Sequence, residues 1–216
     1  MPEPTPVIMC KFPVPGRVKT RLCPPLSHAQ AADVQAAFLK HLATRLPAAV
    51  FCVDDPAAFV ERFGDVRTIQ QGTGNLGDRL IDVRRHLPDT DLLFLGADVP
   101  DLPAGPLLDV MQEPFDVAIA PTDDGGYWCV RVNADVPIES LFGDVDWSSG
   151  REYEQTLANA ARIGATTFIG ESWRDCDEIA DLRALLGRLS DSVDPNDVVL
   201  REGLAFLGDP ATMGDA

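Results

Sequence analysis

The sequence predicts an α/β fold in which a mixed, mainly parallel sheet has helices on both faces, as a three-layer sandwich. Two observations predict it. Short apolar runs alternate along the chain with longer stretches of helical spacing, which is the pattern of repeated strand–helix units. One Asp-Gly-Gly turn at residues 124–126 joins two apolar runs directly, which predicts an antiparallel pair inside the sheet. The 216 residues suffice for a single domain, expected over 1–216 with a core at about 7–190 and an acidic C-terminal extension at 191–216.

Seven apolar runs are the expected strands. The run at 92–96 is strongly apolar, which is typical of a strand that is buried on both faces. The runs at 117–120 and 127–132 flank the Asp-Gly-Gly turn and form the expected antiparallel pair. The remaining strands are expected at 7–10, 49–53, 66–70 and 166–169.

The helices are expected between these runs, where apolar residues recur at intervals of three and four. The first is expected at 28–46, with Ser27 as its N-cap. A proline at the first helical position predicts a short helix at 56–63. Further helices are expected at about 76–87, 104–112, 148–163 and 177–189, with one more helical turn near 197–206.

The composition restricts the partners and the location that we expect. The formal net charge of −16 argues against nucleic acid and against an anionic membrane surface as partners. No apolar run reaches the roughly 18 residues of a membrane-spanning helix, and the first residues lack the features of a signal peptide. The five cysteines include no Cys-x-x-Cys pair, which indicates reduced thiols in a cytoplasmic protein.

A basic loop at residues 11–25 contrasts with the acidic chain. No Asp or Glu occurs between Glu3 and Asp33, and the loop follows the first expected strand, where sheets of this type bind ligands. Gly16 lets backbone amides approach a ligand, and arginine side chains offer planar forks to phosphate oxygens. The cations of the loop are Lys11, Arg17, Lys19 and Arg21. We expect the loop to bind an anion; the alternative is a solvated loop whose cations pair with surface carboxylates.

Acidic residues in two loops are candidate metal ligands. Asp98 lies two residues past the run at 92–96, where a carboxylate can face a ligand bound over the sheet edge. Mg²⁺ takes one or two protein carboxylates together with phosphate oxygens, so we expect Asp98 to bind a metal ion. The alternative is that Asp98 stabilises a turn or caps the next helix. Asp101 is a second candidate, with the alternative of capping the next helix. Asp175 and Asp177 precede the last long helix, where either could cap that helix or supply a further metal ligand.

The Asp-Gly-Gly turn is a third candidate site. Gly125 and Gly126 exceed what a hairpin requires and would let the backbone approach a sugar or another acceptor beside Tyr127. Asp124 is then a candidate general base. The alternative is a plain hairpin, because Asp-Gly is a strong turn signal.

Several motifs occur in the order found in one known family. They are Lys11-x-Pro-x-Pro-Gly16-Arg17-x-Lys19-Thr20-Arg21, Gly72-x-Gly74-x-Leu76-Gly77-x-Arg79, Gly96-Ala97-Asp98-x-Pro100, Asp124-Gly125-Gly126-Tyr127, Trp147-Ser148 and Asp175-x-Asp177. In them the chain resembles the glycosyltransferase-A-like family of small bacterial proteins, some of which are described as arsenosugar-biosynthesis glycosyltransferases. The resemblance covers residues 7 to about 185. That family is related to the 2-phospholactate and molybdenum-cofactor guanylyltransferases.

The resemblance implies a nucleotide-diphospho-sugar transferase fold and a nucleotide-binding transferase. It implies that the basic loop binds the nucleotide, and that Asp98 binds Mg²⁺ or Mn²⁺. The expected nucleotide-binding residues are Lys11, Gly16, Arg17, Lys19, Arg21 and Gly74; the acceptor-binding residues are Gly125, Gly126 and Tyr127; the metal ligands are Asp98, Asp101 and Asp177; and the catalytic residues are Asp124 and Lys19.

Two reactions fit these expectations. The first is metal-dependent transfer of a sugar from a nucleotide-sugar to a small-molecule acceptor. The alternative is a guanylyltransferase-like reaction that joins a nucleoside triphosphate to a phosphorylated small acid and releases pyrophosphate. A third alternative is a nucleotide sensor that keeps the fold but has no turnover. The sequence leaves open the base, the sugar, the acceptor, the second metal ligand, whether the chain is catalytically active, and whether the protein is a homo-oligomer.

Overall fold

The structure is a computed structural model that describes residues 3–208, so the end of the expected acidic extension lies outside the described residues. Contacts divide the chain into two compact units, which are described one after the other. The first unit comprises Met1–Cys10, Ala48–Gly96 and Leu102–Arg174, and the second comprises Lys11–Pro47, Ala97–Asp101 and Asp175–Ala216. Within the described residues, no helix is long and apolar enough to cross a membrane. A single domain over 1–216 stays a prediction.

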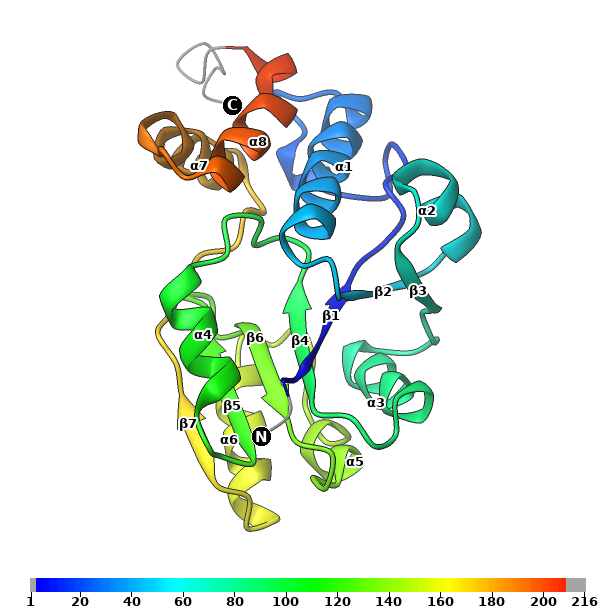
Figure 1. Cartoon of the computed structure of the whole chain (residues 1–216), viewed down its shortest axis with the longest axis vertical. Coiled ribbons are helices and arrows are strands. Elements are labelled where there is room, and N and C mark those ends of the chain that lie inside the picture. The colour runs from blue at the N-terminus through cyan, green and yellow to red at the C-terminus, as the bar shows by residue number, and fades with distance from the viewer. Residues whose placement is uncertain (1–2, 209–216) are drawn as a thin grey trace. The chain divides into compact units, whose positions relative to one another are not determined.

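A seven-stranded sheet forms the centre of the first unit (Figure 1). Its strands are β1 (Thr5–Met9), β2 (Val50–Val53), β3 (Arg67–Gln70), β4 (Leu92–Gly96), β5 (Val117–Pro121), β6 (Tyr127–Val132) and β7 (Thr167–Ile169). They lie in the order β3-β2-β1-β4-β6-β5-β7. Strand β6 runs antiparallel to β4 and β5, whereas the other described pairs are parallel. The mixed, mainly parallel sheet is confirmed, including the antiparallel pair at the Asp-Gly-Gly turn.

Helices of the first unit pack on both faces of this sheet. They are α2 (Pro56–Phe63), α3 (Leu76–His86), α4 (Ala104–Gln112), α5 (Ile138–Phe142) and α6 (Glu152–Arg162). On one face, Val130 and Val132 of β6 join a core with side chains from α3, α5 and α6. On the other face, the Arg131 guanidinium donates to the Val110 carbonyl of α4. Side chains of a strand alternate between the two faces of a sheet, so these neighbouring residues of β6 contact helices on opposite faces.

Two helices of the first unit differ from the sequence-based expectation. Helix α5 is not predicted, because five residues are too few to show a helical period. The helix expected to begin at residue 148 begins at Glu152. Ser148 has a φ of 70° and Gly150 has a φ of 74°, and these left-handed conformations are incompatible with an α-helix at those residues.

The second unit is built mainly from helices. They are the 3-10 helix η1 (Thr20–Leu22), α1 (His28–Arg45), α7 (Ile179–Asp191), α8 (Pro195–Gly203) and the 3-10 helix η2 (Ala205–Leu207). Their apolar side chains share a core that includes Phe38, Leu182 and Leu200. The predicted N-cap of α1 is confirmed, because the Ser27 hydroxyl accepts a hydrogen bond from the Gln30 backbone N–H at 3.3 Å.

The imidazole of His41 is buried in the second unit. Residue His41 of α1 is 2% exposed, and neither ring nitrogen has a hydrogen-bond partner among the described residues. Burial lowers the pKa of His41, and the positive charge of Arg45 lowers it further. The carboxylates of Asp197, Asp101 and Asp194 act in the opposite direction without restoring the ordinary value. The folded protein therefore favours the neutral imidazole.

We expect the free energy of unfolding to decrease as the pH falls below about 6.5, the ordinary histidine pKa. The unfolded chain binds a proton at His41 more readily than the folded protein does, so lower pH favours unfolding. Urea unfolding of the wild type and of His41→Leu between about pH 8 and pH 5 measures this contribution. The wild type should lose stability relative to the variant as the pH falls. A difference between the two proteins that stays constant with pH would exclude this titration.

Candidate functional site

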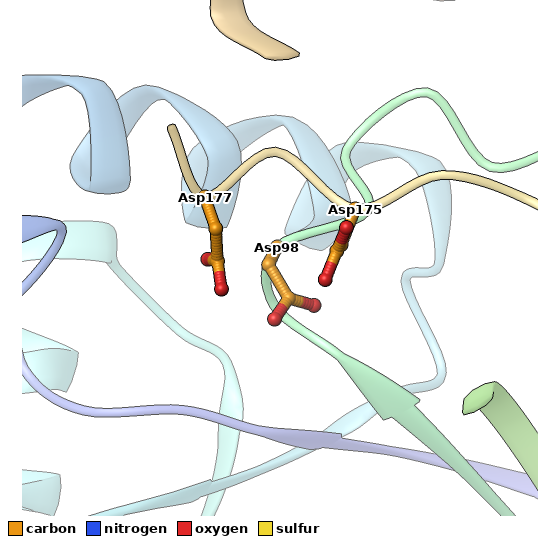
Figure 2. A group of neighbouring side chains, drawn as sticks. All are labelled: Asp98, Asp175 and Asp177. Atoms are coloured by element: carbon orange, nitrogen blue, oxygen red, sulfur yellow. The ribbon is translucent and has the colours of Figure 1, made fainter. Parts of the chain in front are cut away.

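Three aspartates of the second unit direct their carboxylates toward a common point (Figure 2). We call Asp98, Asp175 and Asp177 the trio. One carboxylate oxygen from each lies within 4.8 Å of the others, and all three residues are half-buried. Asp98 follows strand β4 by two residues, and the other two lie in the segment that precedes α7. The structure thus brings together two of the expected metal ligands and adds Asp175 to them.

Backbone hydrogen bonds hold the two segments of the trio together. The Cys176 N–H donates to the Asp98 carbonyl at 2.9 Å, so the chain between Asp175 and Asp177 is fixed beside Asp98. Neither Asp175 nor Asp177 is the N-cap of α7. Glu178 occupies that position, and the carboxylate of Asp181 accepts from the Glu178 N–H at 2.7 Å in a capping box. Because other residues cap the helix, the carboxylates of the trio can face one another.

A buried ammonium lies beside the trio. The Nζ of Lys19 donates to Asp177 Oδ1 at 2.9 Å and to the Cys176 carbonyl at 2.8 Å, and the Lys19 side chain is 7% exposed. Burial lowers the pKa of Lys19, but the charges of Asp98 and Asp177 outweigh burial and hold that pKa above its ordinary value. The more exposed guanidinium of Arg21 lies 3.7 Å from Asp177 Oδ2. The residue expected to bind phosphate and act in catalysis, Lys19, therefore makes its hydrogen bonds to the protein.

The donor set of the trio fits a hard divalent ion. Carboxylate oxygens are the ligands that Mg²⁺ and Mn²⁺ prefer. Opposite ligands of Mg²⁺ are about 4.2 Å apart, from Mg–O distances of about 2.1 Å. Three ligands of one octahedral ion include neighbouring pairs about 3.0 Å apart. Carboxylate oxygens separated by up to 4.8 Å would therefore have to approach one another by up to about 1.8 Å, through rotation of the side chains. Asp98, Asp175 and Asp177 could therefore hold such an ion.

Asp101 lies outside the trio. Its Oδ2 accepts from Arg188 Nε at 2.9 Å and from Arg188 Nη2 at 2.8 Å, and its side chain is 9% exposed. This ion pair ties the loop after β4 to helix α7. The structure thus gives Asp101 a stabilising partner, where the sequence predicted a metal ligand.

The other cations of the basic loop are exposed. Lys11, Arg17 and Arg21 all have exposed side chains, and the Arg17 N–H donates to the Val14 carbonyl at 3.0 Å to close a turn. Gly16 in that turn has a φ of 78°, a conformation that favours glycine. The exposed guanidinium groups are suited to bind a phosphate-bearing ligand.

In the first unit, side chains of neighbouring residues pack against the glycine-rich turn at Gly74 and form hydrogen bonds with it. Arg79 of α3 donates to the Gly74 carbonyl at 3.2 Å and to Gln71 Oε1 at 2.9 Å. A Cβ on Gly74 would lie 2.3 Å from the carboxylate of Asp78, which forms a capping box with Asn75. The turn therefore needs glycine at this position for its own packing, and nucleotide binding by Gly74 stays a prediction.

The Asp-Gly-Gly turn of the first unit is also closely packed. Asp124 Oδ1 accepts from the Thr122 hydroxyl at 2.5 Å and from the Gly126 N–H at 3.1 Å, so this carboxylate organises the turn. The hydroxyl of Tyr127 is buried near the Thr156 hydroxyl, and burial raises the pKa of the Tyr127 hydroxyl more than Thr156 lowers it. A buried hydroxyl is a poor contact for a ligand. The acceptor-binding and general-base assignments in this turn stay predictions.

Gly125→Ala is expected to lower the free energy of unfolding by about 2–4 kcal/mol. Gly125 has a φ of 91°, and a Cβ there would lie 1.9 Å from the Gly150 carbonyl oxygen. Gly16→Ala is the matched control, because Gly16 has a similar φ of 78°, but no atom of residues 3–208 lies within 4 Å of an added Cβ. Strain alone should lower the stability of that control by about 1 kcal/mol. Thermal unfolding measures both variants, and equal losses would contradict a clash at Gly150.

The family model described as "Uncharacterized protein conserved in bacteria (DUF2064)" matches residues 30–149, which is more than half of the 216 residues. The chain belongs to this DUF2064 family. The matched residues include Asp98 and Asp124 and end before Asp175. A search of curated proteins finds no match.

The DUF2064 chain is similar in fold to solved structures that are described as transferases. A protein from Desulfovibrio desulfuricans G20, described as a "putative nucleotide-diphospho-sugar transferase", is 25% identical with a TM-score of 0.83, over 96% of this chain and 97% of that one. A cytidylyltransferase from Leptospira borgpetersenii is 14% identical with a TM-score of 0.58, over 98% of both chains. A nucleotidyl transferase from Methanothermobacter is 15% identical with a TM-score of 0.58, over 94% of this chain and 100% of that one. The expected nucleotide-diphospho-sugar transferase fold is confirmed.

Proposed function

We propose that this chain is a metal-dependent transferase that moves a sugar from a nucleotide-sugar to a small-molecule acceptor. One observation carries the proposal: the trio of Asp98, Asp175 and Asp177 lies in the same compact unit as the exposed cations of the basic loop. Carboxylates for a divalent ion and guanidinium groups for phosphates are the two elements that a nucleotide diphosphate requires. The transferase class agrees with the description of the Desulfovibrio relative, which is similar over nearly its whole length.

The proposed reaction depends on compensation of the negative charge of the diphosphate. Mg²⁺ or Mn²⁺ bound by the trio would neutralise negative charge that develops on the departing diphosphate. Arg17 and Arg21 would bind phosphate oxygens and hold the donor in place. Lys19 keeps the carboxylate of Asp177 oriented toward the other two. Activation of the acceptor hydroxyl by Asp124 stays a prediction from the residues of the Asp-Gly-Gly turn. The cytoplasmic location and the homo-oligomer also stay predictions.

Nucleotidyl transfer is the second candidate function. The basic loop holds four cations between residues 11 and 21, which also suits the higher charge of a nucleoside triphosphate. In that reaction the chain would join the nucleotide to a phosphorylated small acid and release pyrophosphate. The two candidates share the trio and the loop and differ in their leaving group.

The product that is released distinguishes the two candidates. A thermal-shift panel of nucleotides and nucleotide-sugars with Mn²⁺ first selects the ligand, because a ligand at about 100 times its Kd adds about 2.7 kcal/mol of stability. Turnover with that ligand and a panel of acceptors is then measured. Release of a nucleoside diphosphate supports glycosyl transfer, and release of pyrophosphate supports nucleotidyl transfer. Absence of any nucleotide-dependent shift would contradict both.

A further inference from the structure

Contacts of its side chain hold Lys19 beside the trio. Its ammonium contacts Asp177 and the Cys176 carbonyl, and it lies 5.9 Å from the centre of the Phe38 ring. Residue Lys19 has a φ of 47° and a ψ of 37°, the left-handed conformation that residues with a side chain rarely adopt. The fold therefore maintains an unfavourable backbone conformation at the residue whose ammonium lies against the trio.

The local charges show what this ammonium does. Three carboxylates with oxygens within 4.8 Å of one another repel and would separate without nearby positive charge. Lys19 and Arg21 compensate two of the three negative charges, and Lys19 does so from a site that is 7% exposed, where solvent screens little. A divalent ion that enters the trio meets the same ammonium at short range and is repelled by it.

We propose that Lys19 is a positioning residue that acts as a built-in counter-ion of the trio. It compensates the charge of the carboxylates before the divalent ion arrives, and its repulsion of that ion outweighs this help and lowers the affinity of the ion for the protein alone. A phosphate-bearing ligand supplies further oxygen ligands to the ion and negative charge that compensates both cations. The ion and the phosphates are then expected to bind cooperatively, and this inference rests on the proposed function.

The cooperativity has a reciprocal signature. If a phosphate-bearing ligand raises the affinity for the divalent ion, the ion raises the affinity for that ligand by the same factor. Removal of the Lys19 charge should strengthen binding of the ion alone and weaken this coupling. A merely structural role for Lys19 predicts weaker binding of the ion when Lys19 is removed, because the trio would come apart.

The experiment compares binding of Mn²⁺ to the full chain in the wild type, in Lys19→Met and in Arg21→Met. The free-ion electron paramagnetic resonance signal measures Mn²⁺ binding, and equilibrium dialysis of labelled inorganic pyrophosphate with and without Mn²⁺ measures the coupling. Lys19→Met should bind Mn²⁺ about tenfold more tightly than the wild type, and Mn²⁺ should enhance its pyrophosphate binding less. Arg21→Met removes the same charge from a side chain that is 68% exposed, so its Mn²⁺ affinity should change by about twofold at most.

Two further variants keep the test decisive. Lys19→Gln is neutral but can still donate to the Cys176 carbonyl, so it should also bind Mn²⁺ more tightly if Lys19→Met is poorly folded. Lys19→Arg keeps the charge and should keep the weak affinity of the wild type. Unchanged or weaker Mn²⁺ binding in both neutral variants would overturn the role of Lys19 and leave the metal site standing. Failure of the wild type to bind Mn²⁺, with or without pyrophosphate, would overturn the proposed metal site itself.

Discussion

Asp98→Asn is expected to abolish Mn²⁺ binding and metal-dependent turnover while the protein stays folded. The substitution removes one of three carboxylates that face a common point and replaces it by a neutral amide of the same shape. The backbone hydrogen bond from the Cys176 N–H to the Asp98 carbonyl does not depend on the side chain and should persist. Loss of a charged contact of this kind costs several kcal/mol of barrier, or roughly a few hundredfold in rate. Mn²⁺ titration and turnover measure the two effects separately.

Asp101→Asn is the matched control for this prediction. It makes the same chemical change three residues further along the same loop, but Asp101 contacts Arg188 and not the trio. We expect Asp101→Asn to retain Mn²⁺ binding and to lower the free energy of unfolding, because the Arg188 guanidinium loses its ionised partner. Mn²⁺ binding that is undiminished in Asp98→Asn, or lost equally in both variants, would contradict the assignment of Asp98.

The sequence predicts Asp98 and Asp177 as metal ligands and Asp175 only as an option. Asp98 stands out because it follows a strongly apolar strand, and that signal is local. Asp175 and Asp177 reach it through a contact across 78 residues, the hydrogen bond from Cys176 to Asp98, which no local pattern encodes. The Asp-x-Asp spacing is the only local signal, since alternate residues of an extended segment point the same way.

The role of Lys19 shows the same limit. Its place in a basic loop predicts a solvent-facing cation that binds phosphate, and sequence patterns contain no information on its partner. The structure pairs it with Asp177, which lies 158 residues away. Lys19 and Arg21 are close in sequence, but the side chain of Lys19 is buried and that of Arg21 is exposed. The reason is that, of the two, only Lys19 is packed against the buried ring of Phe38.

The fold is more predictable than the site because its signals are periodic and local. All seven strands and most helices follow from apolar patterning, which burial of the sheet enforces. The glycines of the Asp-Gly-Gly turn correctly indicate an unusual backbone conformation, but the structure requires Gly125 for close packing. A Cβ on Gly125 would collide with Gly150. Gly150 lies in a loop that the sequence predicted to be helical. Glycine composition alone cannot distinguish close packing from room for a ligand.

The buried guanidinium of Arg131 is the second group whose loss should have a large effect. Arg131 lies on β6 and is 1% exposed. It donates to the carbonyls of Val110 at 2.9 Å and of Glu113 and Phe115 at 2.7 Å, and it also donates to the side chain of Asn133. Two of these carbonyls belong to the end of α4 and its C-cap, where the helix leaves acceptors unsatisfied. One side chain thus fastens the end of α4 to the sheet.

Arg131→Met is therefore expected to lower the free energy of unfolding by about 3–5 kcal/mol, because three carbonyls lose a charged donor. In a chain of this size the melting temperature should fall by roughly 10 °C. Arg162→Met is the matched control, since Arg162 is 56% exposed and its partner Asp144 is 80% exposed; its effect should stay within about 0.5 kcal/mol. Arg131→Lys keeps the charge but cannot reach all the acceptors, and should lie between the two. Calorimetry orders the three variants, and equal melting temperatures for Arg131→Met and Arg162→Met would show that the carbonyls of α4 find other donors.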